Sequence, residues 1–179
     1  MTFKLPFRIL VFTLSIVSFF MFASGSKVKK ELPAIKKGQF QLKAYGIFDQ
    51  NICGSATFVE EVREGRKHNE SSQIWLKFDF SSIDHHNSIE IILPNTRIHN
   101  LKEGKVYQFY NRSLNGSDVD RIYGFADIGS IDELPFFAER GTLIVKKIDG
   151  SDIIGEVNAE FKNASRGKII FKGSFNANE

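Results

Sequence analysis

The stretch QIWLKFDF, residues 73–80, places an apolar side chain at every second position. Ile74, Leu76, Phe78 and Phe80 alternate with mostly polar residues, which is the period of a strand with one face in the core and one face in water. Antiparallel sheets are the usual structures in which one face is dry and the other is wet. The stretch therefore predicts that the domain is built on antiparallel β-structure.

The same alternation recurs along the chain beyond Gly38 and is interrupted by turn sequences. Asp149-Gly150 suits the positive φ angles of a tight hairpin, Asn163 to Gly167 closes the next hairpin, and Asn115-Gly116 separates two earlier runs. The one helical turn that we expect in the domain is residues 130–133. The pattern predicts nine or ten strands, at about residues 39–48, 54–63, 73–81, 88–93, 105–111, 121–128, 136–139, 141–148, 153–162 and 168–177.

Short strands at this spacing predict an all-β domain, either an antiparallel β-sandwich or a flattened barrel. Cys53 is the one cysteine, so no internal disulfide can form, and we expect its thiol to be buried and inert. Stability must come from packing, to which the 18 Phe are well suited. The expected core is drawn from Phe40, Leu42, Phe58, Ile74, Leu76, Phe78, Phe80, Ile89, Ile91, Leu93, Tyr123, Phe125, Val157, Phe161, Ile169, Phe171 and Phe175.

The N-terminus has the three-part layout of a secretory signal peptide. Lys4 and Arg8 precede an uncharged apolar run, residues 9–22, which small residues follow up to Ser26. The run is shorter than the roughly 20 residues that a membrane-spanning helix needs. We therefore expect a signal-peptide helix at residues 1–25 that is cleaved near Gly25 and Ser26, a basic leader at 26–38 and a single β domain at 39–179.

This layout predicts a secreted or periplasmic protein that has no integral membrane span after cleavage. The formal net charge of +3 includes Lys4 and Arg8, so the processed chain is close to neutral. A near-neutral domain exerts little long-range attraction on phosphate, and we expect no nucleic acid partner. We expect a monomer with an envelope or extracellular partner that the sequence does not identify.

Motifs for catalysis and for metal binding are missing from the sequence. There is no Gly-x-Ser-x-Gly elbow, no Gly-rich phosphate loop and no Cys-His arrangement of known spacing. Asp84, His85 and His86 form one loose group, whereas a zinc site needs three or four ligands at suitable spacing, so a polar turn is the simpler interpretation. We expect no cofactor, no metal and no enzymatic activity.

Some apolar residues fall in the outward phase of their strands. Trp75 lies between Ile74 and Leu76, so it must point away from the core when those two point into it. If such residues meet on one outer face, they form a patch of the kind that marks binding surfaces. If a loop or another strand covers them, they form a satellite core. The candidate ligand-binding or partner-binding residues are Trp75, Tyr45, Ile47, Ile92 and Ile170.

The C-terminal third resembles a family of uncharacterised exported β-domains of bacteria, many of which are lipoproteins. The likeness lies in the hairpin series of residues 140–150, 154–161 and 167–175, and in Ile91-Ile-Leu-Pro-Asn95 ahead of Gly104. The resemblance implies an exported β-sandwich and supplies no catalytic residue. Lipidated members carry Cys at the position of Ser26, so this chain is expected to lack that anchor.

These observations favour an exported, non-enzymatic binding or surface-interaction module of the cell envelope, with an unknown ligand. Two alternatives stay open. The first is a calycin-like barrel that holds a small apolar ligand, which the Phe content permits. The second is an enzyme that uses loop carboxylates or Asp84, His85 and His86.

Overall fold

The alternating runs form nine β-strands in the part of the chain that the computed structural model describes, residues 35–64, 70–81, 86–110 and 121–179. The strands are β1 (Gln39–Gly46), β2 (Gln50–Glu64), β3 (Glu70–Ser81), β4 (His86–Pro94), β5 (Val106–Tyr110), β6 (Arg121–Asp127), β7 (Phe136–Asp149), β8 (Asp152–Lys162) and β9 (Lys168–Asn178). A 3₁₀ helix, η1 (Ile98–Asn100), lies between β4 and β5.

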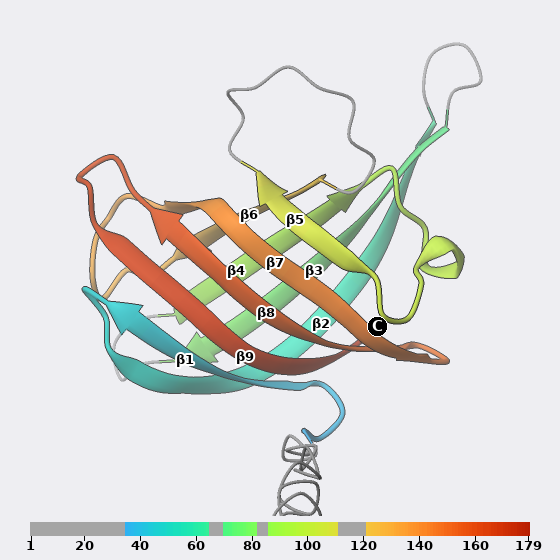
Figure 1. Ribbon diagram of the computed structural model, residues 1–179, viewed down its shortest axis with the longest axis horizontal. Helices are drawn as coiled ribbons and strands as arrows, with labels where there is room; N and C mark the ends of the chain where they lie inside the picture. The colour runs from blue at the N-terminus through green and yellow to red at the C-terminus, as the bar shows by residue number, and fades with distance from the viewer. Residues whose placement is uncertain (1–34, 65–69, 82–85, 111–120) are drawn as a thin grey trace, which may run out of the picture. The chain divides into compact units, whose positions relative to one another are not determined.

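The strands close into a barrel in the order β1-β2-β3-β4-β6-β5-β7-β8-β9, and β9 pairs with β1. In Figure 1, β7, β8, β9 and β1 form the near wall, and β2, β3 and β4 cross behind them. Neighbouring strands are antiparallel except β5 and β6, which run parallel, and β2 meets β9 in parallel at one residue pair. The expected all-β fold is therefore confirmed, as a closed and mixed barrel.

Two of the predicted turns lie in the described residues and are confirmed. Asp149 pairs with Asp152 across a tight turn in which Gly150 has a φ of 61°. In the next hairpin, the amide of Asn163 donates to the carbonyl of Gly167 at 3.2 Å.

Residues 136–149 form one strand, where the sequence suggested two. The register against β8 shifts between Ala138 and Arg140, so Glu139 is an extra residue that bulges β7. Gly141 follows with a φ of 136°, which an L side chain rarely adopts. The strand bends at these residues and continues. The helical turn expected at residues 130–133 is not formed: the structure has a hydrogen-bonded turn at residues 129–131, in which the amide of Ile131 donates to the carbonyl of Ile128.

Phenylalanine rings fill the interior of the barrel. Phe78 packs against Phe40 and Phe175 with ring centroids 5.3 and 5.2 Å apart, and Phe161 packs against Phe171 and Phe109 at 5.2 and 6.1 Å. All the expected core residues are buried except Tyr123 and Phe125. The period-two prediction of the core is confirmed for the other strands.

Tyr123 and Phe125 were predicted in the wrong phase, because β6 turns Ile122, Gly124 and Ala126 inward. A Cβ at Gly124 would lie 2.9 Å from the ring of Phe109 and 3.3 Å from that of Phe161. These rings from β5 and β8 already fill the space beside Gly124, so a larger inward side chain would not fit there. The two aromatic residues of β6 consequently face outward.

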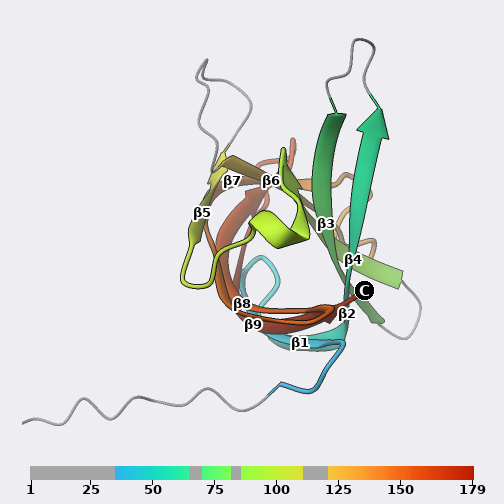
Figure 2. The same cartoon turned by 90° about the vertical axis from the view of Figure 1, so that its right-hand side faces the viewer.

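The segment between β4 and β5 covers one opening of the barrel, as Figure 2 shows. Leu101 is buried in the core and Ile98 packs against it. The amide of Ile98 donates to Glu60 of β2, and that of Gly104 donates to the carbonyl of Val145 of β7. The hairpin of β2 and β3 extends past this end, because β3 pairs with β4 only from Gln73 onward.

Several predictions fall on residues outside the described part. These are the signal peptide with its cleavage position, the greater part of the basic leader, the Asn115-Gly116 turn, and Asp84 and His85. Within the described residues, no helix has the length and apolar character needed to cross a bilayer. Residues 35–179 cluster as one compact unit.

The ring packing predicts which Phe residues stabilise the barrel. Phe175→Ala leaves a cavity beside Phe78 and should lower the free energy of unfolding by about 3–5 kcal/mol. The matched control is Phe137→Ala, because Phe137 is 58% exposed; its cost should be about 1 kcal/mol or less. Urea titration followed by circular dichroism measures both, and equal losses would contradict the assignment of the interior.

Candidate functional site

The strands fork where β5 ends. Near its start, β6 pairs with β5 through Ile122 and Phe109. Farther along the strand, β6 pairs with β7 through Phe125 and Phe137. β7 pairs with β5 as far as Tyr110, which is opposite Arg140. Tyr123 and Gly124 of β6 thus lie between the two pairings. The strands on either side diverge here, and the bulge at Glu139 adds to the bend.

A groove of about 520 Å³ opens at this fork on the outer wall of the barrel. Four aromatic residues contribute to it, and Tyr123 and Phe137 are 42% and 58% exposed. Large apolar surfaces left open to water often mark binding sites. The groove is lined by Ile92, Tyr110, Tyr123, Gly124, Phe125, Phe137 and Ala138.

A cation on β6 contacts the ring of Tyr110. The guanidinium carbon of Arg121 lies 4.0 Å from the centroid of the Tyr110 ring, which is within the range of a cation–π contact. The contact fixes the orientation of a ring that is half-buried. Apart from the two tyrosine hydroxyls, the described residues that line the groove offer no side-chain acid, base or nucleophile. The arrangement suits binding better than covalent chemistry.

Two of the five predicted site residues lie in a row that leads to the groove. Trp75 is directly opposite Ile92, and Ile92 is directly opposite Tyr123. Val59, which is 60% exposed, continues the row on the other side of Trp75. We call Val59, Trp75, Ile92 and Tyr123 the apolar row. The half-buried Trp75 has a buried indole nitrogen for which the described residues provide no hydrogen-bond partner.

The other three predicted site residues form a separate group on β1, on the residue that follows it and on β9. Tyr45 is opposite Ile170. The amide of Ile47 donates to the carbonyl of Lys168 at 3.1 Å, and its side chain lies next to Gly167. From Ile170 the same line of cross-strand neighbours passes through Glu160 and Arg140 to Tyr110 of the groove. The two groups therefore approach the groove from opposite sides.

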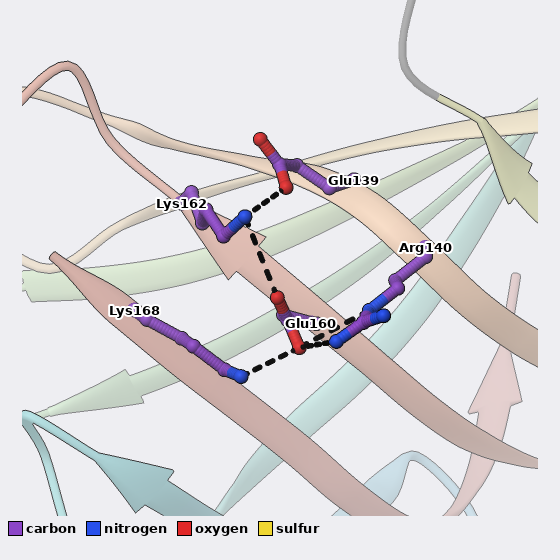
Figure 3. Close-up of polar contacts among 5 residues, drawn as sticks. All are labelled: Glu139, Arg140, Glu160, Lys162 and Lys168. Carbon is purple, nitrogen blue, oxygen red and sulfur yellow. Dashed lines mark hydrogen bonds and ion pairs between the residues drawn. The ribbon is translucent and has the colours of Figure 1, made fainter. Parts of the chain in front are cut away.

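An ionic cluster joins β7, β8 and β9 along that line (Figure 3). Glu160 Oε2 accepts from Lys168 Nζ at 2.8 Å and from Arg140 at 2.9 and 3.3 Å, and Lys162 Nζ lies 3.6 Å from Oε1. Lys162 also bonds Glu139. The side chain of Glu160 is only 8% exposed, whereas that of Arg140 is 74% exposed. We call these five residues the ionic cluster.

The cations hold Glu160 in its ionised form. Hydrogen bonding from Lys168, followed by that from Arg140, lowers the pKa of this carboxyl from 4.5 to about 2, although burial acts in the opposite direction. The same contact with Glu160 raises the pKa of the Arg140 guanidinium. The cluster is thus fully charged at neutral pH.

The histidine group offers no site in the described residues. His86 lies in β4, where a polar turn was expected, and its Nε2 is 3.2 Å from Asp79 Oδ1. No three His, Cys, Asp or Glu side chains in the described part of the chain are grouped so as to hold a metal ion. Cys53 was expected to be buried and is exposed, because Ile52 takes the inward position next to it in β2.

The interior of the barrel is where a calycin-like ligand would bind. The closed barrel is compatible with such a protein. Its interior, however, is occupied by Phe rings that are at most 6% exposed and that touch one another. Apolar surface that a ligand can reach is found instead in the groove on the outer wall.

Comparison of the chain with protein-family models, with curated proteins and with solved structures finds no match.

The ionic cluster predicts an acid-dependent loss of stability. The pKa of Glu160 is lower in the folded state, so its contribution is complete above about pH 4.5 and is lost as the pH falls toward 2. Glu160→Gln should cost about 1–3 kcal/mol of unfolding free energy at pH 7, and the variant and the parent should converge near pH 2. Urea titrations at several pH values measure the difference.

Glu156→Gln is the control, because Glu156 lies on the same strand and contacts Lys146 at the surface. Its cost at pH 7 should be smaller than that of Glu160→Gln, since a surface pair contributes little. A Glu160→Gln penalty that stays constant between pH 7 and pH 2 would show that the cluster does not hold this carboxylate ionised.

Proposed function

We propose that this protein is a binding module that holds a saccharide in the groove at the strand fork, outside the barrel. The observation that carries the proposal is the set of aromatic rings, Tyr110, Tyr123, Phe125 and Phe137, gathered around one opening of about 520 Å³. Single exposed aromatic residues are common on protein surfaces, but a hollow that several of them line is not.

The shape and chemistry of the groove favour a sugar ring. One face of a pyranose carries C–H groups and packs against an aromatic face, while the ring edge carries hydroxyls. The hydroxyls of Tyr110 and Tyr123 lie among the lining residues and can exchange hydrogen bonds with such an edge. Where the apolar row crosses β4 and β3, it provides further contact area for sugar units that adjoin the one in the groove.

Catalysis is not part of the proposal. Hydrolysis of a glycosidic bond needs two carboxyl groups on either side of it, and none is found among the groove-lining residues that the structure describes. The buried carboxylate of the ionic cluster, Glu160, lies beneath cations that keep it ionised, so it cannot donate a proton near neutral pH.

An envelope or extracellular location is the second part of the proposal. The N-terminal sequence, with its basic residues, short apolar run and small residues before Ser26, supports export by a signal peptide. Saccharides of the envelope or of its surroundings would then be the available ligands.

Oligosaccharide binding to the purified full-length chain tests the function. Trp75 is the one tryptophan and is next to Ile92 of the groove, so its fluorescence should change when a ligand binds. A panel of neutral and acidic oligosaccharides should contain at least one that produces a saturable change. Phe137→Ala should lower the affinity for that ligand by about tenfold, because it removes one of the aromatic rings that the sugar packs against.

Val62→Ala is the matched control, since Val62 is also an exposed apolar side chain but lies outside the groove. It should leave the affinity unchanged. A panel in which no saccharide binds, or a ligand whose affinity Phe137→Ala leaves unaltered, would contradict the proposed function.

A further inference from the structure

The ionic cluster adjoins the groove on the side of β7. Arg140 is the direct cross-strand neighbour of Tyr110, and Lys162 is the direct cross-strand neighbour of Phe137. Both Tyr110 and Phe137 line the groove. A ligand ring that packs against these two aromatic side chains would therefore have both cations, Arg140 and Lys162, close to its edge.

The cluster carries more positive than negative charge. Arg140, Lys162 and Lys168 provide three cations, whereas Glu139 and Glu160 provide two carboxylates. Glu160 lies underneath, with its side chain 8% exposed, and the three cationic side chains remain open to solvent. Glu160 thus gathers the cations into one patch while leaving their outer sides for another anion.

The charged residues around the groove differ from one side of it to the other. On the side of β4, the neighbour of Phe125 is Glu90, whose pKa is raised chiefly by burial. Around Tyr110, the neighbours are Arg121 of β6 and Arg140 of β7. An anionic substituent would be attracted to the side of Arg140 and repelled by an ionised Glu90.

We propose that the groove binds an acidic saccharide, with the sugar ring on Tyr110 and Phe137 and the carboxylate of a uronic acid held by Arg140 and Lys162. The inference rests on the proposed function and names its ligand class. The guanidinium of Arg140 has N–H groups that Glu160 does not use, and a planar fork of this kind matches a carboxylate.

A carboxylated sugar fits these residues better than a nucleic acid or an anionic membrane. Both of those present an extended array of phosphates and are bound by long tracks or clusters of cations. The ionic cluster has one cation in excess of its carboxylates, and the chain minus its first 25 residues is close to neutral. The one excess cation of the cluster matches a single carboxylate on a sugar ring.

Two probes that differ only at their carboxyl groups test the inference on the full-length chain. One is a hexamer of galacturonic acid, and the other is the same hexamer with its carboxyl groups methyl-esterified. The acid should bind about tenfold more tightly than the ester at low salt, because its carboxylate makes charge-assisted hydrogen bonds. This preference should fall as the ionic strength rises.

Arg140→Gln should abolish the preference of about tenfold, because the loss of the guanidinium should weaken binding of the acid more than binding of the ester. It retains Lys162 and Lys168 around Glu160, so the cluster stays paired and the barrel should fold. Lys172→Gln is the control, because Lys172 is exposed on β9 away from the groove. It should preserve the preference.

Equal affinities of the acid and the ester would contradict the preference for an acidic saccharide. They would not contradict the saccharide-binding function. An Arg140→Gln variant that keeps the preference would also overturn the proposed binding of an acidic saccharide. If neither hexamer binds, and single-stranded DNA or vesicles that contain phosphatidylglycerol bind instead, the acidic saccharide is wrong. If no member of the wider panel binds either, the saccharide-binding function fails with it.

Discussion

The packing of phenylalanine rings inside a closed barrel is the constraint on which the rest of the structure depends. Large rings such as Phe175 enter the interior only where the facing strand is small, and a Cβ on Gly155 would lie 2.6 Å from that ring. The same requirement gives β6 its inward Gly124, opposite Phe109 and Phe161. Because Gly124 keeps the inner face of β6 clear of these rings, Tyr123 and Phe125 lie on the outer face and line the groove.

The alternation of side chains predicted the fold class and the buried faces of the strands, since transfer of apolar groups out of water acts on each strand separately. It failed at Tyr123 and Phe125, where both faces of β6 carry apolar residues and the larger ones are outside. It could not predict that β5 and β6 run parallel, because a side-chain period of two is the same for either direction. The bulge at Glu139 depends on pairing with β8, which no local pattern records.

The candidate site was predicted only in part. The outward phase of Trp75 and Ile92 could be inferred locally, but their place beside Tyr123 follows from the register of three strands. Phe137 and Tyr110 were missed, since they become a site only where two distant segments diverge around the end of β5. Glu160 was missed as well, because its alternation marks it as an ordinary outward residue, and its burial comes from cations on three strands.

The pairing of β1 with both β2 and β9 has a consequence for how the chain is made. The first strand of the barrel cannot gain its second neighbour until residues 168–178 have left the ribosome, so the circle of hydrogen bonds forms only after nearly the whole domain has been synthesised. Contacts between such distant segments slow folding. The barrel therefore closes late, after all its other strands have been made.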